Sequence, residues 1–279
     1  MIYLYNTLKG LFFENDLGVF KTQEQDLDKL LCSTDLYFKL KKSTDQLKPE
    51  ANSIRRLNLS LLPPIKSQEV WASGVTYFQS KTARMEEAKT AGGADFYDRV
   101  YEAERPELFF KSTPNRVRGT KSKLRIRKDS AWNVPEPELT LVVSPNKKII
   151  GYTIGNDMSS RSIEGENPLY LPQAKSYTGS TSLGPCILLT ENPISAKTKI
   201  QMKIFRSGKE VFDGKTEVGQ IKRSFSSLVD YLYREMDFPM GCFLMTGTGI
   251  IPPDNFTLHS GDKIEIKIKG IGLLENSVE

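Results

Sequence analysis

Two glutamates in the segment VPEPELTLVV are the first residues whose type and spacing suggest chemistry. Glu136 and Glu138 stand two positions apart in a stretch that reads as extended. Side chains at positions i and i+2 of an extended chain point to one face, about 7 Å apart. Two carboxylates so placed repel each other unless a positive group lies between them. Pro135 and Pro137 predict a sheet edge or bulge here, and a solvated strand face is the alternative interpretation of the pair.

A third carboxylate follows an apolar run further along the chain. The segment KKIIGYTIGNDMSSRS predicts a strand that ends in a polar loop of Gly155, Asn156 and Asp157. Carboxylate oxygens without histidine or cysteine suit Mg²⁺, Mn²⁺ or Ca²⁺ and not zinc. We therefore predict that Glu136, Glu138 and Asp157 bind a divalent cation, with Mg²⁺ as the first choice. Open positions on that cation would accept water or a bidentate substrate.

Lys175 lies downstream in the Gly- and Ser-rich segment LPQAKSYTGSTSLGP. A lysine close to a metal and an anionic substrate can polarise a carbonyl group or carry a proton. An exposed loop lysine is the alternative interpretation.

Other residue types exclude several classes of function. The single histidine, His259, lies in the polar turn TLHSGD without a nucleophile motif, which argues against a Ser-His-Asp triad. Cys32, Cys186 and Cys242 form no CxxC pair, so they predict neither a disulfide framework nor a zinc site. No apolar run approaches the roughly 20 residues that cross a bilayer. The N-terminus lacks the pattern of a signal peptide, so we expect a cytoplasmic protein.

The charge balance is mildly basic, with 39 Lys and Arg against 34 Asp and Glu. The segment RVRGTKSKLRIRK (116–128) concentrates part of this excess. No RNA-binding aromatic signature, helix-turn-helix pattern or finger spacing accompanies it, so we expect no nucleic-acid partner. A solvated strand-and-loop face is the plain interpretation, and steering of an anionic substrate is the alternative.

The elements that must position these residues fall into two parts. Residues 1–65 are predicted to form a small N-terminal domain with a helix in TQEQDLDKLLCS, ending at Pro63-Pro64. Residues 66–279 contain two helical patterns, at 82–91 and 224–236, among many short β-rich runs. These runs are LTLVV, KKIIGYTI, CILLT, KIQMKIF and DKIEIKIKG, the last with strictly alternating isoleucines. The fold class is therefore α+β with a large β component.

The order of the motifs resembles the fumarylacetoacetate hydrolase family. ExE is followed by GYTIGNDMSSR, an AK…GP segment, MTGTGIIPP and SGDKIEIKIKGIGLLEN, over roughly residues 68–276. The resemblance implies a β-rich roll with a flanking sandwich after a small N-terminal domain. It also implies a dimer or larger homo-oligomer, Mg²⁺ or Ca²⁺ on Glu136, Glu138 and Asp157, and Lys175 beside the metal.

One departure from the family's hydrolases changes the expected reaction. Hydrolytic members carry an NYxxH segment whose histidine activates water, whereas this chain has GVTYFQSKTARMEEA, with Ser80 or a neighbour in its place. The chemistry then shifts from water activation toward proton abstraction and elimination. The missing histidine, the ERPELFFKS segment and the spacing of the site residues resemble members that dehydrate a five-carbon 2-keto-3-deoxy sugar acid to 2,5-dioxopentanoate.

The expected reaction needs an acid and a base on either side of the scissile bond. Glu107, flanked by Phe109 and Phe110, is the candidate for one role, because burial near aromatic rings raises the pKa of a carboxyl group. A simple ion pair with Arg105 is the alternative. Lys175 is the candidate C3 base or the group that orients the keto oxygen.

Four further residues are predicted to contact the substrate. Phe78 and Gln79 lie where the family places a closing loop, and Lys111 directly follows the ERPELFF run. Thr248 lies in the MTGTG turn, for which a tight β connection is the alternative interpretation.

Two rival functions stay open. An acylpyruvate hydrolase or oxaloacetate decarboxylase would use the same scaffold and would differ in its substrates. A non-enzymatic metal-stabilised protein or a basic nucleic-acid binder would show no turnover, and salt-sensitive binding to polynucleotide would identify the latter.

Overall fold

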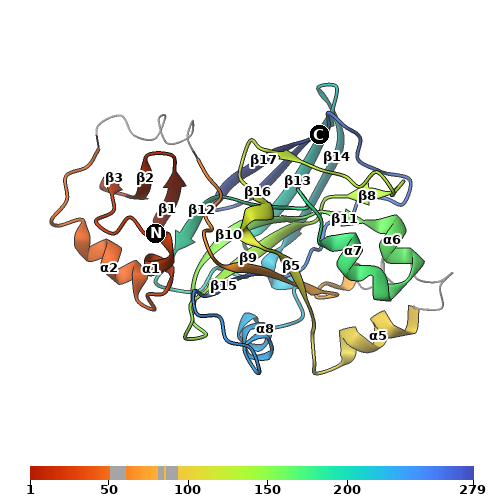
Figure 1. Ribbon diagram of the computed structural model, residues 1–279, viewed down its shortest axis with the longest axis horizontal. Helices are drawn as coiled ribbons and strands as arrows, with labels where there is room; N and C mark the ends of the chain where they lie inside the picture. Colours follow the sequence, from red (N-terminus) through yellow and green to blue (C-terminus); the bar gives the residue numbers. More distant parts are fainter. Residues whose placement is uncertain (51–60, 81–84, 86–93) are drawn as a thin grey trace.

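The chain folds around one large sheet, and a second sheet packs across one of its faces (Figure 1). This computed structural model describes residues 1–50, 61–80, 85 and 94–279. In spatial order, the large sheet consists of β3 (Gly18–Lys21), β2 (Gly10–Asn15), β1 (Ile2–Thr7), β12 (Thr181–Leu189), β10 (Ile149–Asp157), β9 (Pro137–Val143), β15 (Cys242–Met245), β4 (Glu69–Gly74) and β5 (Glu107–Ser112), with β6 (Val117–Arg118) paired to β12.

Two smaller sheets and several short helices complete the described fold. The second sheet runs in the order β14 (Lys209–Glu217), β13 (Lys199–Arg206), β16 (Lys263–Ile268), β17 (Gly272–Val278) and β7 (Lys123–Leu124), and β8 (Asn133–Val134) pairs with β11 (Ser159–Ser160). The α-helices are α1 (Leu27–Leu31), α2 (Leu36–Ser43), α5 (Ala94–Glu102), α6 (Arg161–Glu166), α7 (Leu171–Lys175) and α8 (Phe225–Leu232).

The two faces of the large sheet are buried against different partners. On one face, Leu139 and Leu141 of β9 belong to the same core as Ile266 of β16 and Leu228 of α8. On the other face, Val142 of β9 belongs to a core shared with the N-terminal strands and helices α1 and α2. Because side chains alternate along a strand, Glu138 lies on the same face as Val142, away from the second sheet.

Most of the predicted elements are confirmed. The five β-rich runs form β9, β10, β12, β13 and β16, and the buried Ile264, Ile266 and Ile268 alternate along β16 with more exposed charged residues. The pattern at 224–236 forms α8, whose N-cap Ser224 side chain accepts a hydrogen bond from Ser227 N. Helix α1 forms in the first predicted helical stretch. The predicted helix at 82–91 lies outside the described residues except for Met85.

Two local predictions about the carboxylate strands are wrong. Pro135 and Pro137 do not mark a sheet edge, because β9 lies in the middle of the sheet between β10 and β15. Pro137 is tolerated there as the first residue of its strand. Asp157 also does not lie in a loop. Strand β10 continues through it, since both β9 and β12 still pair with residues up to Asn156 or Asp157.

The first 65 residues do not form a separate sheet. Strand β1 pairs with β12, so β1, β2 and β3 extend the large sheet at one edge (red in Figure 1). Their core also contains Val142 and Phe243 from the central strands. An independent N-terminal domain at residues 1–65 therefore stays a prediction.

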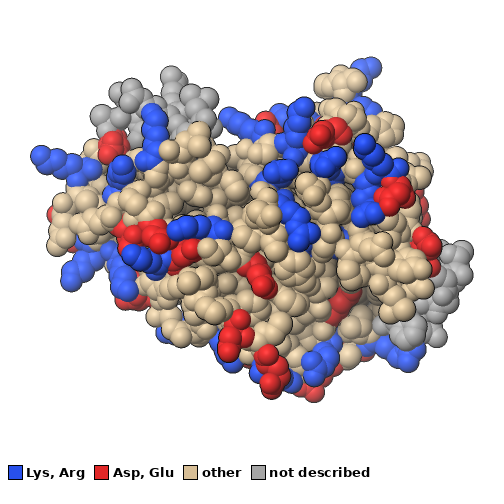
Figure 2. Space-filling view, viewed as in Figure 1, with Lys and Arg blue, Asp and Glu red and all other residues tan. Residues whose placement is uncertain are grey.

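Surface charge shows no single-sign face in the view of Figure 2, where Lys and Arg side chains are interspersed with Asp and Glu. Within the described residues, no helix combines the length and the apolar character that spanning a membrane would require.

Candidate active site

The three predicted metal ligands converge in one buried cluster. Each of Glu136, Glu138 and Asp157 offers a carboxylate oxygen, and these oxygens lie within 4.8 Å of one another. Their residues are only 5%, 1% and 1% exposed. Oxygens bound to one Mg²⁺ or Ca²⁺ lie about 2.0–2.6 Å from the ion, so a cluster of this width fits a hard divalent cation. The predicted grouping is confirmed.

The sheet topology explains why residues far apart in sequence meet here. Glu138 lies near the start of β9, and its antiparallel neighbours β10 and β15 end at Asp157 and Met245. Strand β4 runs parallel to β15 and ends at Gly74, while β5 runs back and starts at Glu107. Five adjacent strands therefore present their site residues at one end of the sheet.

Lys175 is a buried cation that contacts two of the three carboxylates. Its Nζ donates to Glu136 Oε2 at 2.7 Å and to Asp157 Oδ2 at 3.2 Å, and the residue is 0% exposed. Its Nζ also lies 5.9 Å from the ring centroid of Phe109. The alternative of an exposed loop lysine is excluded, because α7 ends by carrying Lys175 into the buried site. Whether it acts in catalysis is untested by this geometry.

Arg161 is a second buried cation, and sequence analysis did not single it out. Its Nη2 donates to Glu136 Oε1 at 2.7 Å, and its Nε lies 3.9 Å from Glu164 Oε2. Ser159 Oγ in turn donates to Glu164 Oε2 at 2.6 Å. The signal was its place at the end of GYTIGNDMSSR, four residues after Asp157, where β11 gives way to α6.

Lys111 supports the cluster from behind Asp157. Its Nζ lies 2.8 Å from Asp157 Oδ1 and donates to the carbonyls of Met158 (3.1 Å) and Lys175. The residue is 0% exposed, and burial lowers the pKa of this ammonium while the Asp157 charge opposes that effect. Because Lys111 contacts Asp157 and two nearby backbone carbonyls, the geometry suits a support for Asp157. Its predicted contact with substrate is untested.

The Glu138 carboxylate accepts a hydrogen bond from the backbone, and its surroundings shift its pKa. Gly247 N donates to Glu138 Oε2 at 2.5 Å, from the turn that follows β15. Burial raises the pKa of the Glu138 carboxyl well above its usual value, and the charges of Asp157 and Glu136 raise it further. A cation bound among these oxygens would compensate both effects.

The remaining predicted residues lie at different distances from this cluster. Thr248 is 4% exposed and lines the cavity beside the carboxylates, as do Ser80 and Phe109. Its Oγ1 accepts from Ile250 N at 3.1 Å, which closes the turn. Glu107 begins β5, and its carboxylate lies against Gly74, another residue that lines the cavity.

Phe78 and Gln79 point elsewhere in this structure. Both are exposed, Phe78 to 62%, and neither lines the cavity among the described residues. The Phe78 ring meets Tyr101 edge-on, with centroids 6.5 Å apart. Residues 81–84 and 86–93, which follow them, lie outside the described part of the chain. Their contact with substrate therefore stays a prediction.

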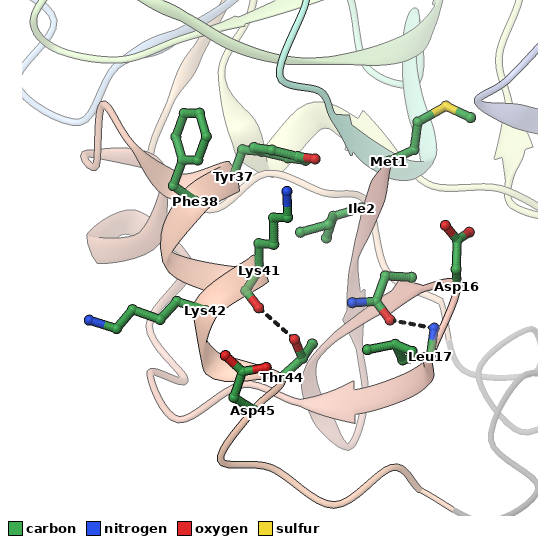
Figure 3. Close-up of a pocket in the computed structure, with 11 residues that line it drawn as sticks. Met1, Ile2, Asp16, Leu17, Tyr37, Phe38, Lys41, Lys42, Thr44 and Asp45 are labelled. Carbon is green, nitrogen blue, oxygen red and sulfur yellow. Dashed lines mark hydrogen bonds between the residues drawn. The ribbon is translucent and has the colours of Figure 1, made fainter.

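A larger hollow lies at the other end of the molecule. This N-terminal hollow has a volume of about 800 Å³ and lies among Ile2, Leu17, Tyr37, Phe38, Lys41 and Asp45 (Figure 3). Lys41 extends toward the Tyr37 ring, with its Nζ 5.8 Å from the centroid. The free space among the described residues of the carboxylate pocket is only about 10 Å³. The charged residues that line this carboxylate pocket are nevertheless Glu136, Glu138, Asp157, Arg161 and Lys175.

Comparisons with known proteins identify the family of this chain. A family model described as Fumarylacetoacetate (FAA) hydrolase C-terminal matches residues 70–279. The chain is 45% identical over 216 residues to a probable 2-keto-3-deoxyxylonate dehydratase of Haloferax volcanii, covering 77% of this chain and 73% of that protein. It is 41% identical over 227 residues to the 2-dehydro-3-deoxy-D-arabinonate dehydratase of Saccharolobus solfataricus, covering 80% and 75%.

A solved structure extends the likeness over the whole chain. It is a 2-keto-3-deoxy-D-arabinonate dehydratase complexed with magnesium and 2,5-dioxopentanoate. It superposes with a TM-score of 0.82 at 32% identity and covers 100% of this chain and 98% of its own.

Proposed function

The chain belongs to the fumarylacetoacetate hydrolase family, and within it we propose a magnesium-dependent hydro-lyase that converts 2-keto-3-deoxy-D-arabinonate to 2,5-dioxopentanoate and water. The observation that carries this proposal is the buried cluster of Glu136, Glu138 and Asp157 beside Lys175. The cluster occurs in a chain 41% and 45% identical to proteins named as dehydratases of five-carbon 2-keto-3-deoxy acids.

The reaction requires a balanced set of proton transfers. A C3 proton leaves and the C4 hydroxyl, protonated by an acid, departs as water, which gives a C3–C4 double bond. Loss of a C5 proton and addition of a proton at C3 shift this double bond to C4–C5. The resulting enol takes up a proton at C4 and loses its hydroxyl proton to become the aldehyde of the product. When bound at the three carboxylates, a divalent cation supplies a Lewis acid for the 2-keto oxygen, which makes the C3 proton more acidic.

Lys175 is our candidate for handling the C3 proton. Its Nζ is held between Glu136 and Asp157, so it stays next to any group that the carboxylate cluster binds. The same two contacts fix its direction, which favours proton transfer at one carbon over others.

Glu107 is our candidate acid for the C4 hydroxyl. Glu107 and Phe109 are two positions apart along β5, so their side chains share one face of the strand, and Phe109 lines the carboxylate pocket. General acid–base catalysis contributes about 10²–10⁴-fold to such a step. Thr248, Phe78 and Gln79 complete the proposed substrate contacts, and Lys111 acts on the substrate through Asp157.

A hydrolytic function has less support. The described residues that line the carboxylate pocket include Ser80 and no histidine. His259 is exposed, and its backbone N–H donates to Asp262 Oδ2 in the turn before β16.

We also propose a cytoplasmic homo-oligomer. Cys32, Cys186 and Cys242 are all free, which suits a reducing compartment. The oligomer rests on the family resemblance, and sedimentation of the purified protein would measure it.

Turnover assays test the proposed function. Wild-type protein is mixed with 2-keto-3-deoxy-D-arabinonate, an acylpyruvate or oxaloacetate, each with Mg²⁺ or with a chelator. We expect aldehyde formation from the first substrate only, and only with Mg²⁺. Cleavage of the acylpyruvate or decarboxylation of oxaloacetate, with no aldehyde from the sugar acid, would replace the proposal with one of its rivals.

A further inference from the structure

A side chain at Gly74 in β4 would collide with the Glu107 carboxylate. The two residues face each other across the antiparallel pair of β4 and β5. A Cβ atom built on Gly74 would lie 2.0 Å from Glu107 Oε2 and 2.5 Å from Glu107 Cδ. The backbone of Gly74 is not in the left-handed region, so glycine is not needed there for its conformational freedom. The Glu107 carboxylate occupies the space that a side chain at position 74 would take.

The backbone around Gly74 is fixed on both sides. Ser73 Oγ donates to the Glu107 carbonyl at 3.1 Å, and Thr76 Oγ1 donates to the Thr246 carbonyl at 2.7 Å. Between them, Val75 is 4% exposed and holds a φ of 52°, a costly conformation for a β-branched residue that persists only where its surroundings impose it. A methyl group at position 74 would therefore displace the flexible tip of Glu107 and not the strand.

The residues around Gly74 and Glu107 place the Glu107 carboxylate next to the pocket. Phe109 shares the face of Glu107, lines the carboxylate pocket and lies under Lys175 Nζ. Ser73, Gly74 and Val75 line the same pocket. Gly74 thus lines the pocket, and the Glu107 carboxylate occupies the space that a side chain on Gly74 would take.

We propose that Gly74 is a positioning residue that seats the Glu107 carboxylate beside the carboxylate pocket, where Glu107 delivers a proton to the leaving hydroxyl of the substrate. This inference rests on the proposed dehydratase function for the role of Glu107. The seating itself depends only on the geometry of the two residues.

Four variants test the proposal: Gly74→Ala, Glu107→Gln, and Gly74→Ala combined with either Glu107→Asp or Glu107→Gln. We expect Gly74→Ala to lower kcat by about 10²-fold, the lower range for loss of a general acid, while KM and Mg²⁺ affinity by calorimetry change less than about threefold. The change at position 107 from Glu to Asp removes one methylene, so Gly74→Ala/Glu107→Asp should recover at least about tenfold in kcat over Gly74→Ala alone. Adding Gly74→Ala to Glu107→Gln should cause no further loss, since contacting residues are non-additive.

A crystal structure of Gly74→Ala gives a readout that does not depend on turnover. We expect unchanged strands β4 and β5 and a displaced Glu107 carboxylate. An unmoved carboxylate, a wild-type kcat in Gly74→Ala, or independent effects in the double variants would overturn the proposal. A wild-type enzyme inactive on the sugar acid would instead overturn the proposed function, and the crystal structure would still decide the seating of Glu107.

Discussion

The carboxylate pocket and the N-terminal hollow are both depressions in one protein, but they differ in size, burial and charge. The hollow measures about 800 Å³ and exposes large apolar side chains, including Leu17 and Phe38 at 70% and 53%. The carboxylate pocket leaves about 10 Å³ among the described residues, and its charged groups are almost fully buried. Size alone would direct a search for function to the wrong end of the molecule.

The free-energy cost of exposing apolar side chains differs from that of burying carboxylates, and this explains why only one of the two regions indicates a function. Exposed apolar side chains are ordinary on protein surfaces, and they need no ligand to account for them. Three carboxylates in a dry interior are costly unless cations and hydrogen bonds compensate them. Here Lys175, Arg161 and Lys111 supply that compensation within the structure. A fold retains such an arrangement when its chemistry requires it.

The largest expected effect comes from removing one ligand charge in the pocket. Glu138→Gln keeps the shape of the side chain but weakens cation binding, and we expect kcat/KM to fall by about 10³-fold or more, because the Lewis acid contributes several kcal/mol. Less carboxylate repulsion should leave the metal-free Tm unchanged or higher. Steady-state kinetics and calorimetric Mg²⁺ titration measure both effects, with the exposed Glu210→Gln as control.

Nearly normal Mg²⁺ binding and turnover in Glu138→Gln would show that Glu138 is not a metal ligand, and it would weaken the contrast between the two regions.

Breaking the support behind Asp157 should destabilise the fold. Lys111→Met leaves the buried Asp157 carboxylate without the cation 2.8 Å away, and loss of one partner of a buried pair costs about 3–5 kcal/mol. Urea unfolding measures the change in the free energy of unfolding. Lys203→Met breaks an exposed pair with Glu210 on the second sheet and should leave the unfolding midpoint almost unchanged. Equal shifts in the two variants would show that burial does not distinguish these ion pairs.

Arg161 should tune the metal site without forming part of it. Arg161→Gln removes the donor 2.7 Å from Glu136 Oε1, so that carboxylate is held less firmly although Lys175 still donates to its Oε2. Changes to groups that orient metal ligands typically reduce metal affinity by about 10–100-fold. Calorimetry would measure the affinity for Mg²⁺. Wild-type affinity in this variant would mean that Arg161 is not needed to orient Glu136.

The pH dependence of metal binding should follow the burial of Glu138. Its pKa is raised in the metal-free protein by burial and by the neighbouring carboxylates, so below that pKa the group keeps a proton that a cation must displace. Mg²⁺ affinity should therefore fall as the pH is lowered, by at most about tenfold per pH unit for one displaced proton. Titrations in buffers of different ionisation enthalpy would count the protons released. Binding without proton release would contradict the raised pKa.

The smallest effect is expected in the N-terminal hollow. Phe38→Ala should change kcat/KM less than about twofold and stability by about 0.5 kcal/mol or less, as for most surface substitutions. Leu36→Ala in the same helix removes a side chain that is 1% exposed and should cost about 2–5 kcal/mol. Thermal unfolding and turnover assays separate the two. A large loss of turnover in Phe38→Ala would give the hollow a function that its exposure does not suggest.

The ligand carboxylates and the β-rich fold were predictable because their signals are local. Extended geometry places Glu136 and Glu138 on one face, and alternation identifies the buried isoleucines of β16. The position of β9 within the sheet was not predictable, since Pro137 satisfies the rule for a strand's first residue as well as the rule for an edge. Sheet order depends on contacts between distant segments.

Arg161 and Gly74 were missed for a similar reason. Arg161 reaches Glu136 only because α6 starts directly after β11, and Gly74 faces Glu107 only once β4 and β5 are paired. Neither contact has a signature in local spacing. Residues that position the groups of a site are therefore harder to predict from sequence than the metal ligands themselves.

The most direct test of the central claim is anomalous diffraction from crystals soaked in Mn²⁺. We predict a single strong peak among the carboxylates of Glu136, Glu138 and Asp157, with oxygens at about 2.0–2.6 Å, and its loss in Glu138→Gln crystals. A peak elsewhere, for example beside Asp45 in the N-terminal hollow, or no peak at saturating Mn²⁺, would contradict the assignment of the carboxylate pocket as the metal centre.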